Sequence, residues 1–581
     1  MRNTKIVCTL GPSTDKDGVL RELIENGMNV ARFNFSHGDY DEHRHRYETL
    51  RALSKELDRP VAAMLDTKGP EIRLGTFKNG SENLVAGQKF TLTSRDVEGT
   101  NEISSITYKE LPRDVQPGGR IMLDDGLISL RIENVTDTDI HCVVENDGVI
   151  KTKKGVNVPG VHLSMPYMST RDRSDILFGV EMGFDLISAS FTRCAQDIQE
   201  IRHLVNENGG NIRIIAKIEN QEGVDNIDEI LSVADGIMVA RGDMGVEIDF
   251  AEIPAIQKHL IDRTMSAGKL VITATQMLDS MIVNPRPTRA EITDVANAIY
   301  DGSSAVMLSG ETAAGKYPVE ALKAMSKIAD TTESDSNYNR LVHHALTKDS
   351  RLSISAAVAH AACTTAADIH ASAIITVSKS GETARLLSRC RPATPIIACV
   401  MDECVRRQLN AYWGITPLIM PYAHSTDEMI SMSVETAEQA GLVHPGEMVV
   451  VTAGVPVGVS GTTNMIKVHL VGNSLLSGVG IGKQNAKGNV CICRTAAEAA
   501  KKFKAGDILV APYTNNDFLP YMRSAAGIIV EEAGTNSHAA IVGLTLNKAV
   551  IVGASHAMRI LTDGASILMD CEHGVVQSTV E

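Results

Sequence analysis

Two short motifs place charged side chains directly after apolar runs. The motif IRIIAKIEN has Lys217 and Glu219 near its end. The motif ADGIMVARGDMGVEI has Arg241 and Asp243 directly after its apolar run. Two carboxylates at such positions can hold a hard cation such as Mg²⁺, which takes its other ligands from water and phosphate oxygens. A lysine beside that cation suits phosphoryl transfer, which needs positive groups near the developing charge. The alternative is two ordinary strand ends capped by surface ion pairs.

The hydrophobic pattern predicts the elements that must position these residues. Short apolar runs bounded by polar residues are typical of buried parallel strands, and three lie before residue 70 and five between 167 and 340. Helical segments separate them, so strand and helix alternate. Eight such units predict an α/β fold, a TIM (β/α)8 barrel, with its active site at the carboxyl ends of the strands. An open doubly wound sheet is the alternative, because the period does not show closure.

Polar side chains also follow the other predicted strands. If the barrel closes, they all surround one opening. Arginine and lysine there can bind phosphate oxygens, and backbone N–H groups around Gly242 can bind a substrate carboxylate. Asn34, Ser36, Asp66 and Thr67 offer hard oxygen donors that suit a monovalent cation. The remaining residues of this set are Arg32, His37, Lys68, Glu71, Arg73, Thr275 and the segment 309–311.

Changes in texture along the chain predict four domains. Residues 1–69 and 167–340 form the barrel, and closely spaced turn signals between 70 and 166 predict an all-β insertion. Residues 341–472 are predicted to form a separate small α/β domain. The last part, 473–581, opens with a Gly-rich segment that we interpret as a linker into a further domain.

Composition excludes several classes of protein. The net charge of -15 argues against a nucleic-acid binder, which would carry a basic patch. Ten cysteines, mostly within apolar runs, indicate reduced core residues. Cys491 and Cys493 form a C-x-C motif, but no matching Cys/His pair stands nearby, which disfavours zinc. Without a signal sequence or an apolar run of about 20 residues, we expect a soluble, cytoplasmic protein with no membrane partner.

Several motifs together resemble the pyruvate kinase family. They are MNVARFNFSHG, LDTKGPEIR, KKGVNVPG, AKIEN, ARGDMGVE, TATQML and DGSSAVMLSGET, in one order between Lys5 and about Gly472. The resemblance implies transfer of a phosphoryl group from phosphoenolpyruvate to ADP, giving pyruvate and ATP. It also implies a β lid domain inserted after the third barrel strand, a C-terminal allosteric domain and a homotetramer.

The resemblance implies a role for each matching position. Lys217 would stabilise the transferring phosphoryl group, and Glu219 and Asp243 would ligate Mg²⁺ or Mn²⁺. Arg32 and Thr275 would complete the catalytic set. The implied substrate contacts are Arg32, Gly242, Asp243 and Thr275. The implied potassium ligands are Asn34, Ser36, Asp66 and Thr67. The implied nucleotide contacts are Asn34, His37, Arg73 and Lys154, the last brought in by closure of the lid.

A loop in the third predicted domain has the residues of a phosphate site. TVSKSGETAR places Ser378, Ser380, Gly381 and Thr383 between a predicted strand and a predicted helix. Hydroxyls and backbone N–H groups at a helix N-terminus suit a phosphate group. The resemblance makes this loop the site of a phosphorylated effector, either a sugar phosphate or a nucleotide. The alternative is a polar loop that only caps the helix.

The C-terminal part resembles a different family. EEAGTNSHAAIVGLTLNKAVIVGA is similar to the mobile phosphohistidine domain of phosphoenolpyruvate synthase and its relatives, and His538 stands at the position of the phosphorylated histidine. That family has threonine two residues before the histidine, where this chain has Asn536. The chain also shows no Gly-rich nucleotide-grasp domain to charge His538. We therefore predict a structural or regulatory appendage rather than a working phosphocarrier.

Two other function classes stay open. A metal-dependent lyase or aldolase acting on pyruvate or phosphoenolpyruvate would leave the lid, Arg73 and Lys154 without a role. A multistep phosphocarrier that works through His538 would require a nucleotide-charging domain. A non-catalytic scaffold is disfavoured, because every expected catalytic position is filled.

Overall fold

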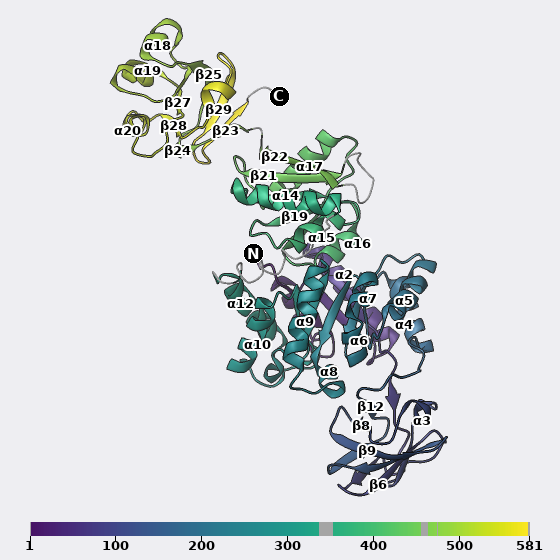
Figure 1. Ribbon diagram of the computed structural model, residues 1–581. Coiled ribbons are helices and arrows are strands. Elements are labelled where there is room, and N and C mark those ends of the chain that lie inside the picture. Colours follow the sequence, from purple (N-terminus) through teal and green to yellow (C-terminus); the bar gives the residue numbers. More distant parts are fainter. Residues whose placement is uncertain (1, 336–337, 339–352, 455–462, 473, 579–581) are drawn as a thin grey trace. The chain divides into compact units, whose positions relative to one another are not determined.

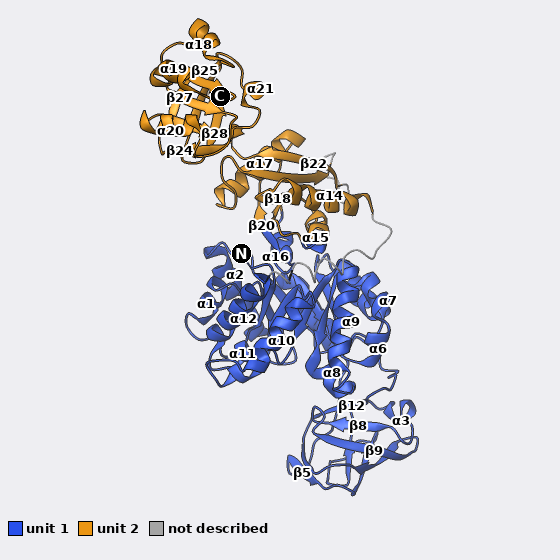
Figure 2. Cartoon of the chain, turned by 60° about the vertical axis from the view of Figure 1, so that its left-hand side comes forward, with its two compact units in different colours: residues 1–351, 388–391, 402–417 blue, residues 352–387, 392–401, 418–581 orange. Residues whose placement is uncertain are grey.

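The computed structural model describes residues 2–335, 338, 353–454, 463–472 and 474–578. Figure 1 follows these residues along the chain. They divide into two compact units, which Figure 2 shows in two colours. Within the described residues, no helix combines the length and the apolar character needed to cross a membrane.

A closed barrel of eight parallel strands forms the centre of the first unit. The order around the barrel is β1-β17-β16-β15-β14-β13-β3-β2, so the prediction of a TIM barrel is confirmed and the open sheet is excluded. The strands are almost entirely apolar and buried, as parallel strands covered by helices must be. They are β1 (Lys5–Thr9), β2 (Val30–Asn34), β3 (Ala62–Asp66), β13 (Leu186–Ala189), β14 (Arg213–Ile218), β15 (Gly236–Ala240), β16 (Leu270–Ala274) and β17 (Ala305–Leu308).

Helices surround the barrel, and several of them begin at side-chain caps. The N-terminus of α2 (Tyr40–Glu56) is capped by Asp39, which accepts a hydrogen bond from the Glu42 N–H at 2.9 Å. Thr288 and Glu291 form a capping box at the start of α10 (Arg289–Tyr300). The others are α1 (Val19–Glu25), α4 (Thr170–Met182), α5 (Ala195–Glu207), α6 (Gln221–Asp225), α7 (Ile227–Val233), α8 (Arg241–Glu247), α9 (Ile253–Ser266), η1 (Asp279–Ile282), α11 (Gly310–Ala313) and α12 (Pro318–Glu333).

The insertion after β3 is built from β-strands, as the turn signals predicted, and all of its strand pairs are antiparallel except β6 with β7. A seven-stranded sheet has the order β4-β12-β8-β9-β10-β6-β7, and β11 pairs with β5. One helical turn, α3 (Leu111–Asp114), interrupts the strands. The strands are β4 (Ile72–Arg73), β5 (Ser81–Leu84), β6 (Lys89–Thr93), β7 (Ile103–Ser105), β8 (Arg120–Leu123), β9 (Ile128–Val135), β10 (Asp139–Val144), β11 (Gly148–Lys151) and β12 (Gly155–Asn157).

The next part of the chain is a five-stranded sheet with the order β20-β19-β18-β21-β22. One of its segments, 402–417, packs with the first unit. There Arg407 Nε donates to Asp185 Oδ1 at 2.9 Å, and Gln408 Nε2 donates to the Asn211 carbonyl at 2.7 Å. The elements are α14 (Ile354–Asp368), β18 (Ala373–Val377), α15 (Glu382–Arg389), β19 (Ile396–Val400), α16 (Glu403–Leu409), β20 (Ile415–Ile419), α17 (Thr426–Gln439), β21 (Met448–Gly454) and β22 (Thr463–Leu470).

The C-terminal part has an eight-stranded sheet with the order β23-β30-β29-β25-β26-β27-β28-β24. The elements are β23 (Ser474–Ser477), β24 (Val479–Ile481), β25 (Ala486–Ile492), α18 (Ala496–Lys502), β26 (Ile508–Ala511), η2 (Asn516–Phe518), α19 (Leu519–Ser524), β27 (Gly527–Val530), α20 (His538–Thr545), β28 (Ala549–Val552), α21 (Ala557–Ile560), β29 (Ser566–Asp570) and β30 (Val575–Ser578).

The prediction of a Gly-rich linker at the start of this part is wrong. β23, β24 and the beginning of β25 occupy the segment and belong to the sheet. Its glycines allow close packing of backbone: a Cβ on Gly480 would lie 1.8 Å from the Cys571 carbonyl oxygen, and one on Gly478 would lie 2.6 Å from the Val552 carbonyl oxygen. A glycine in a strand can mark a place where another backbone segment packs closely, and composition alone does not distinguish this from a flexible linker.

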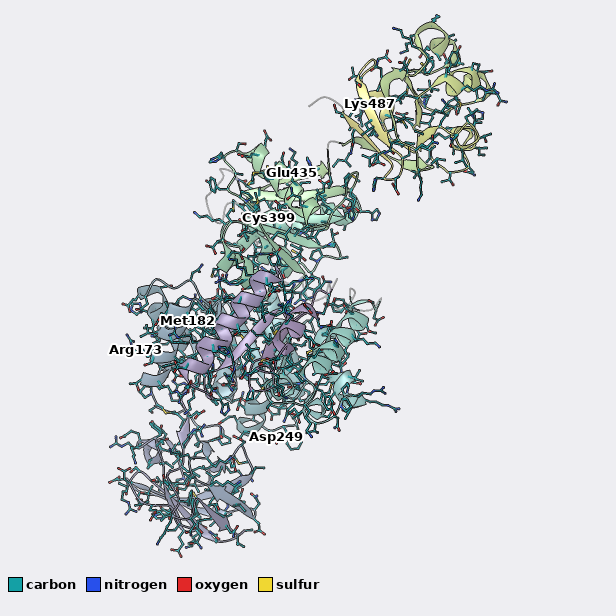
Figure 3. The ribbon with its side chains drawn as sticks, turned by 180° about the vertical axis from the view of Figure 1, so that it is seen from behind. Arg173, Met182, Asp249, Cys399, Glu435 and Lys487 are labelled. Atoms are coloured by element: carbon teal, nitrogen blue, oxygen red, sulfur yellow. The ribbon has the colours of Figure 1, made fainter. Side chains whose placement is uncertain are left out.

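Each part has hydrophobic clusters of its own. The barrel, the insertion and the five-stranded sheet each bury a separate cluster, and the C-terminal sheet buries two. Figure 3 marks Met182 on α4 and Cys399 on β19, which pack in the barrel cluster and the five-stranded-sheet cluster respectively. Separate cores support domains that fold largely independently.

Candidate active site

A cavity of about 720 Å³ lies at the carboxyl ends of the barrel strands and continues against the insertion. Most of the residues singled out by the sequence line it together, as closure of the barrel requires. Asp66, Gly242 and Thr275 are outside the lining. The lining includes Arg32, Asn34, Ser36, His37, Thr67, Lys68, Glu71, Arg73, Lys154, Lys217, Glu219 and Asp243.

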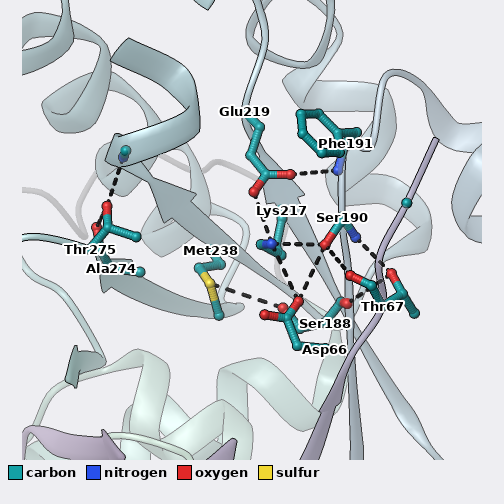
Figure 4. A network of polar contacts seen from close by, with 12 residues as sticks. Asp66, Thr67, Ser188, Ser190, Phe191, Lys217, Glu219, Met238, Ala274 and Thr275 are labelled. Atoms are coloured by element: carbon teal, nitrogen blue, oxygen red, sulfur yellow. Dashed lines mark hydrogen bonds and ion pairs between the residues drawn. The ribbon is translucent and has the colours of Figure 1, made fainter. Parts of the chain in front are cut away.

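A buried cluster of charges lies at the inner end of this cavity (Figure 4). Lys217 Nζ is 2.9 Å from Glu219 Oε1, 3.3 Å from Asp66 Oδ1 and 2.8 Å from Ser190 Oγ. Lys217 and Glu219 are two residues apart at the end of β14, so their side chains leave the chain on the same side. Asp66 is the last residue of β3, which is separated from β14 by one strand, β13. All three carboxylate and ammonium groups are buried, and burial of charge requires such pairing.

The pKa values of this cluster reflect burial opposed by pairing. Burial lowers the pKa of Lys217, but Asp66 and Glu219 outweigh it, so the pKa is raised and the side chain stays charged. Burial raises the pKa of Asp66, but Arg32 and Lys217 outweigh it, so the pKa is lowered. For Glu219, burial dominates over the attraction of Lys217, and the pKa is raised to about 8. Glu219 is therefore the member of the cluster whose charge is least compensated.

Arg32 supplies the second positive charge of the cluster. Its guanidinium forms an ion pair with Asp66, and Nη1 donates to Thr9 Oγ1 at 3.0 Å. These contacts join the ends of the three neighbouring strands β1, β2 and β3. The cluster therefore contains two buried cations, Arg32 and Lys217, and two buried carboxylates. The cations can bind a phosphoryl group only if some of their ion pairs with these carboxylates break.

The four predicted potassium ligands lie on adjacent strand ends. Asn34 and Asp66 are register partners at the ends of β2 and β3, and the Phe35 N–H donates to the Asp66 carbonyl at 3.0 Å. Asn34 Oδ1 accepts the Ser36 N–H at 3.1 Å, which folds the loop back towards the strand end. The oxygen donors predicted from the sequence are therefore brought to one side of the cavity.

The carboxylates predicted for Mg²⁺ fit such an ion. Glu219 Oε2 accepts the Phe191 N–H at 2.6 Å, whereas the buried Oε1 has no hydrogen bond of good geometry among the described residues. Asp243 lies in the first turn of α8 and is exposed to the cavity. Within the described part of the chain, no group of three or more His, Cys, Asp and Glu forms a closed metal site. Two carboxylates with open positions are what Mg²⁺ shared with a substrate phosphate requires.

Gly242 and Thr275 lie against each other beside the cavity. The Gly242 N–H donates to Thr275 Oγ1 at 2.7 Å, and Thr275 has a left-handed backbone with φ 69°. Arg241 Nη2 donates to the Thr275 carbonyl at 2.7 Å, and its Nη1 pairs with Asp294 at 2.7 Å. Arg241 therefore holds an unusual turn in place, a role that the sequence did not predict.

Two of the predicted nucleotide-binding residues have a carboxylate partner. Lys154 Nζ lies 2.7 Å from Asp124 Oδ1, and Arg73 Nε lies 2.6 Å from Glu71 Oε2. Lys68 Nζ lies 3.2 Å from the same Glu71 oxygen. Charged side chains held at the surface of the insertion and facing the cavity can exchange these partners for phosphate oxygens.

The insertion also touches the helix that carries Asp243. Asn157 Nδ2, at the end of β12, donates to Glu247 Oε1, at the end of α8, over 2.7 Å. Both side chains line the cavity. Neither was singled out from the sequence, since an Asn and a Glu 90 residues apart carry no local pattern.

In the five-stranded part, the predicted effector loop is only partly open. The Ser378 and Thr383 side chains are buried, and the Thr383 hydroxyl hydrogen bonds to the Thr463 hydroxyl. Gly381 has φ 75°, and the Ser380 carbonyl accepts Arg385 Nη1 at 2.9 Å. The loop does precede α15, as predicted.

His538 begins α20, with neutral partners on both ring nitrogens. Nδ1 lies 2.9 Å from the Thr514 hydroxyl, and Nε2 lies 3.2 Å from Asn516 Oδ1. Because an amide oxygen only accepts, this contact assigns the ring proton to Nε2. The Ser537 hydroxyl caps the helix at the Ala540 N–H.

A closed (β/α)8 barrel whose cavity is lined by a buried lysine and by carboxylates has the features of a phosphotransferase site. Residues 1–322 match the family model "Pyruvate kinase, barrel domain", 356–469 match "Pyruvate kinase, alpha/beta domain", and 503–574 match "PEP-utilising enzyme, mobile domain". The chain belongs to the pyruvate kinase family and is an enzyme. The resemblances drawn from the sequence are thereby confirmed.

Two relatives match this chain over nearly its whole length. The chain is 48% identical to a pyruvate kinase of Sporosarcina psychrophila over 579 residues, covering 99% of each chain. It is 50% identical to a pyruvate kinase of Geobacillus stearothermophilus over 578 residues, covering 99% of this chain and 98% of the relative. A crystal structure of a pyruvate kinase from Cryptosporidium parvum superposes with a TM-score of 0.77 at 39% identity, covering 81% of this chain and 96% of that one.

Proposed function

We propose that this enzyme transfers the phosphoryl group of phosphoenolpyruvate to ADP, giving pyruvate and ATP. The observation that carries the proposal is the buried cluster of Lys217, Asp66 and Glu219 at the inner end of the cavity. Loose phosphoryl transfer needs positioning and charge neutralisation more than covalent chemistry, and such a cluster supplies both. Lys217 and Arg32 neutralise charge on the phosphoryl oxygens. Thr275 lies beside the enolate that is left.

Two carboxylates hold the divalent cation in this proposal. Glu219 and Asp243 bind Mg²⁺ or Mn²⁺, and their shared place in the lining of the cavity supports this assignment. When bound, the ion polarises the phosphoryl oxygens. Gly242 and Thr275 bind the rest of the substrate, with Asp243 and Arg32. Asn34, Ser36, Asp66 and Thr67 hold K⁺.

The insertion acts as a lid over the nucleotide. Arg73 and Lys154 exchange Glu71 and Asp124 for the phosphates of ADP, and Asn34 and His37 line the same cavity. A lid that delivers positive charge also excludes water from the transferring group.

Regulation and assembly form a second part of the proposal. A phosphorylated effector, either a sugar phosphate or a nucleotide, binds the loop of Ser378, Ser380, Gly381 and Thr383, where the left-handed Gly381 turns the backbone before α15. The hydroxyls of Ser378 and Thr383 reach it only after the loop opens. The enzyme assembles as a homotetramer. Effector titration of the rate and light scattering of the native protein test these two statements.

One coupled assay separates this function from its competitors. We expect pyruvate to appear from phosphoenolpyruvate only when ADP and Mg²⁺ are present. Pyruvate formation without ADP would indicate a lyase or a phosphatase instead. An ADP-dependent reaction that also leaves stoichiometric phosphate on His538 would indicate a phosphocarrier.

A further inference from the structure

The buried hydroxyl of Ser190 has no role in the proposed function, yet it joins the two halves of the site. Ser190 follows β13 and is 1% exposed. Its Oγ lies 2.8 Å from Lys217 Nζ, 2.6 Å from the Thr67 carbonyl oxygen and 3.3 Å from Asp66 Oδ1 (Figure 4). One side therefore carries the phosphoryl-binding lysine, and the other carries two of the proposed potassium ligands.

The hydrogen atoms in this contact can be assigned. An ammonium group only donates, so Ser190 Oγ accepts from Lys217. The single hydroxyl hydrogen then goes to the Thr67 carbonyl, the shorter of the two remaining contacts. The backbone completes the pair, because the Ser190 N–H donates to Thr67 Oγ1 at 3.1 Å. Ser190 and Thr67 thus hold each other by reciprocal bonds.

The other partners of Lys217 are both committed elsewhere in the proposed function. Asp66 faces K⁺ and Glu219 faces Mg²⁺, so neither carboxylate can serve Lys217 fully in the loaded site. Ser190 Oγ is a neutral partner that needs no cation and can stay in place. A hydrogen bond to a charged donor in a buried site fixes its direction strongly.

We propose that Ser190 is a positioning residue: it holds the Lys217 ammonium towards the cavity and connects it to the potassium-binding segment at Asp66 and Thr67. The inference rests on the proposed function. Binding of the monovalent cation then affects Lys217 through the Ser190 hydroxyl, in addition to the direct contact between Asp66 and Lys217. The sequence does not reveal this role of Ser190, because a serine after an apolar strand is common.

The test compares Ser190→Ala with Ser188→Ala. Ser188 lies on β13, is fully buried, and its hydroxyl lies 4.0 Å from Met238 Sδ, so its removal is a matched control. We expect Ser190→Ala to lower kcat about tenfold to hundredfold at saturating substrates, as small misplacements of a catalytic group do. It should also raise the potassium concentration for half-maximal rate several-fold. Ser188→Ala should leave both values near those of the unaltered enzyme.

A second readout does not depend on turnover. Without substrates, KCl should raise the thermal midpoint of the unaltered protein over tetramethylammonium chloride, and Ser190→Ala should lose most of that difference. Ser190→Cys keeps the size but weakens the hydrogen bonds, and it should show the same changes to a smaller degree; it decides the matter if the alanine variant does not fold.

The outcomes separate this inference from the function on which it rests. A purely structural Ser190 would lower the thermal midpoint equally in both salts and leave the potassium response of the rate unchanged, which would overturn the inference. If the unaltered enzyme forms no pyruvate from phosphoenolpyruvate and ADP, the proposed function itself fails. An unaltered enzyme equally active in both salts refutes the potassium site and the inference together.

Discussion

The barrel cavity and the region around His538 have similar positions in their sheets but different electrostatics, because the first contains buried charges and the second has neutral contacts. Both lie where parallel strands end, since β14 leads to Glu219 and β27 leads to the loop before α20. In the barrel, Lys217 and Glu219 are buried and paired. Around His538, the ring contacts are the neutral Thr514 and Asn516.

This difference supports the proposed location of the chemistry in the barrel cavity. Burial of opposed charges is costly and is seldom the most stable choice, so it is retained where the charges act. Lys217, Asp66 and Glu219 form such a group, with pKa values moved by burial and by one another. The described residues that contact His538 offer no cation for a phosphate. A shared position in the fold does not transfer function between the two sites.

The largest effect on the rate should come from replacing Glu219, and Glu532 provides a matched control in the C-terminal part. Glu219→Gln keeps the shape and removes a charged ligand, so we expect the rate to fall by about a thousandfold with the fold intact. Glu532→Gln changes an exposed carboxylate just after β27, and it should leave the rate unaltered. The rate of pyruvate formation at saturating Mg²⁺ is the measurement, with circular dichroism as the check on folding.

Asp243→Asn should behave as Glu219→Gln does. A near-normal rate in either variant at saturating Mg²⁺ would remove the assignment of the metal site. An equally large loss in Glu532→Gln would show that the contrast between the two regions is wrong.

The lid contact should have the next largest effect. Asn157→Asp sets a carboxylate against Glu247 in place of a donor at 2.7 Å, so the lid should close less often. We expect the KM for ADP to rise about tenfold, in the range of coupling between neighbouring groups. Adding Glu247→Gln restores a donor and acceptor in reversed order and should recover most of the loss. Failure of the double variant to recover would mean that the contact does not couple the lid to α8.

Potassium dependence should change by a similar factor. Glu71 lines the same cavity as the proposed potassium ligand Thr67, and Lys68 and Arg73 neutralise its charge. We expect strong activation by K⁺, and Glu71→Lys should reduce the ratio of rates in KCl and tetramethylammonium chloride about tenfold. An added unit charge near a cation has an effect of about 1–2 kcal/mol. Glu71→Gln should fall between the two, and equal unaltered rates in both salts would contradict the idea.

Much of this site could be predicted because its signals are local. Lys217 and Glu219 follow one strand, Asn34 and Ser36 another, and closure of the barrel brings them together. Ser190 and Glu247 could not be found, because their roles arise from contacts between distant segments. The Gly-rich segment was misjudged for a related reason. The approach of Gly480 to Cys571 depends on the folded sheet and not on neighbouring residues.

Removal of the C-terminal part should have a small effect. The proposed domain boundary lies at Gly472, before β23 begins the eight-stranded sheet. Because the clusters of that sheet are separate from the barrel cluster, a chain ending at Gly472 should still convert phosphoenolpyruvate and ADP. Its thermal midpoint and its response to effector can change. A truncated chain that is folded but inactive would contradict the separation of the two regions.

The smallest effect should follow from His538→Ala in the full chain. Nucleophilic attack on a phosphoryl group needs a ring nitrogen with a free lone pair and cations to receive the oxygens, whereas here Thr514 occupies Nδ1 and Asn516 occupies Nε2. The steady-state rate should therefore stay within about threefold, as for a residue outside the catalytic unit. Incubation with labelled phosphoenolpyruvate should leave His538 unlabelled, while Glu219→Gln in the same assay reports loss of turnover. Stoichiometric acid-labile label, or a folded His538→Ala enzyme without activity, would make the C-terminal site a phosphocarrier and end the contrast with the barrel.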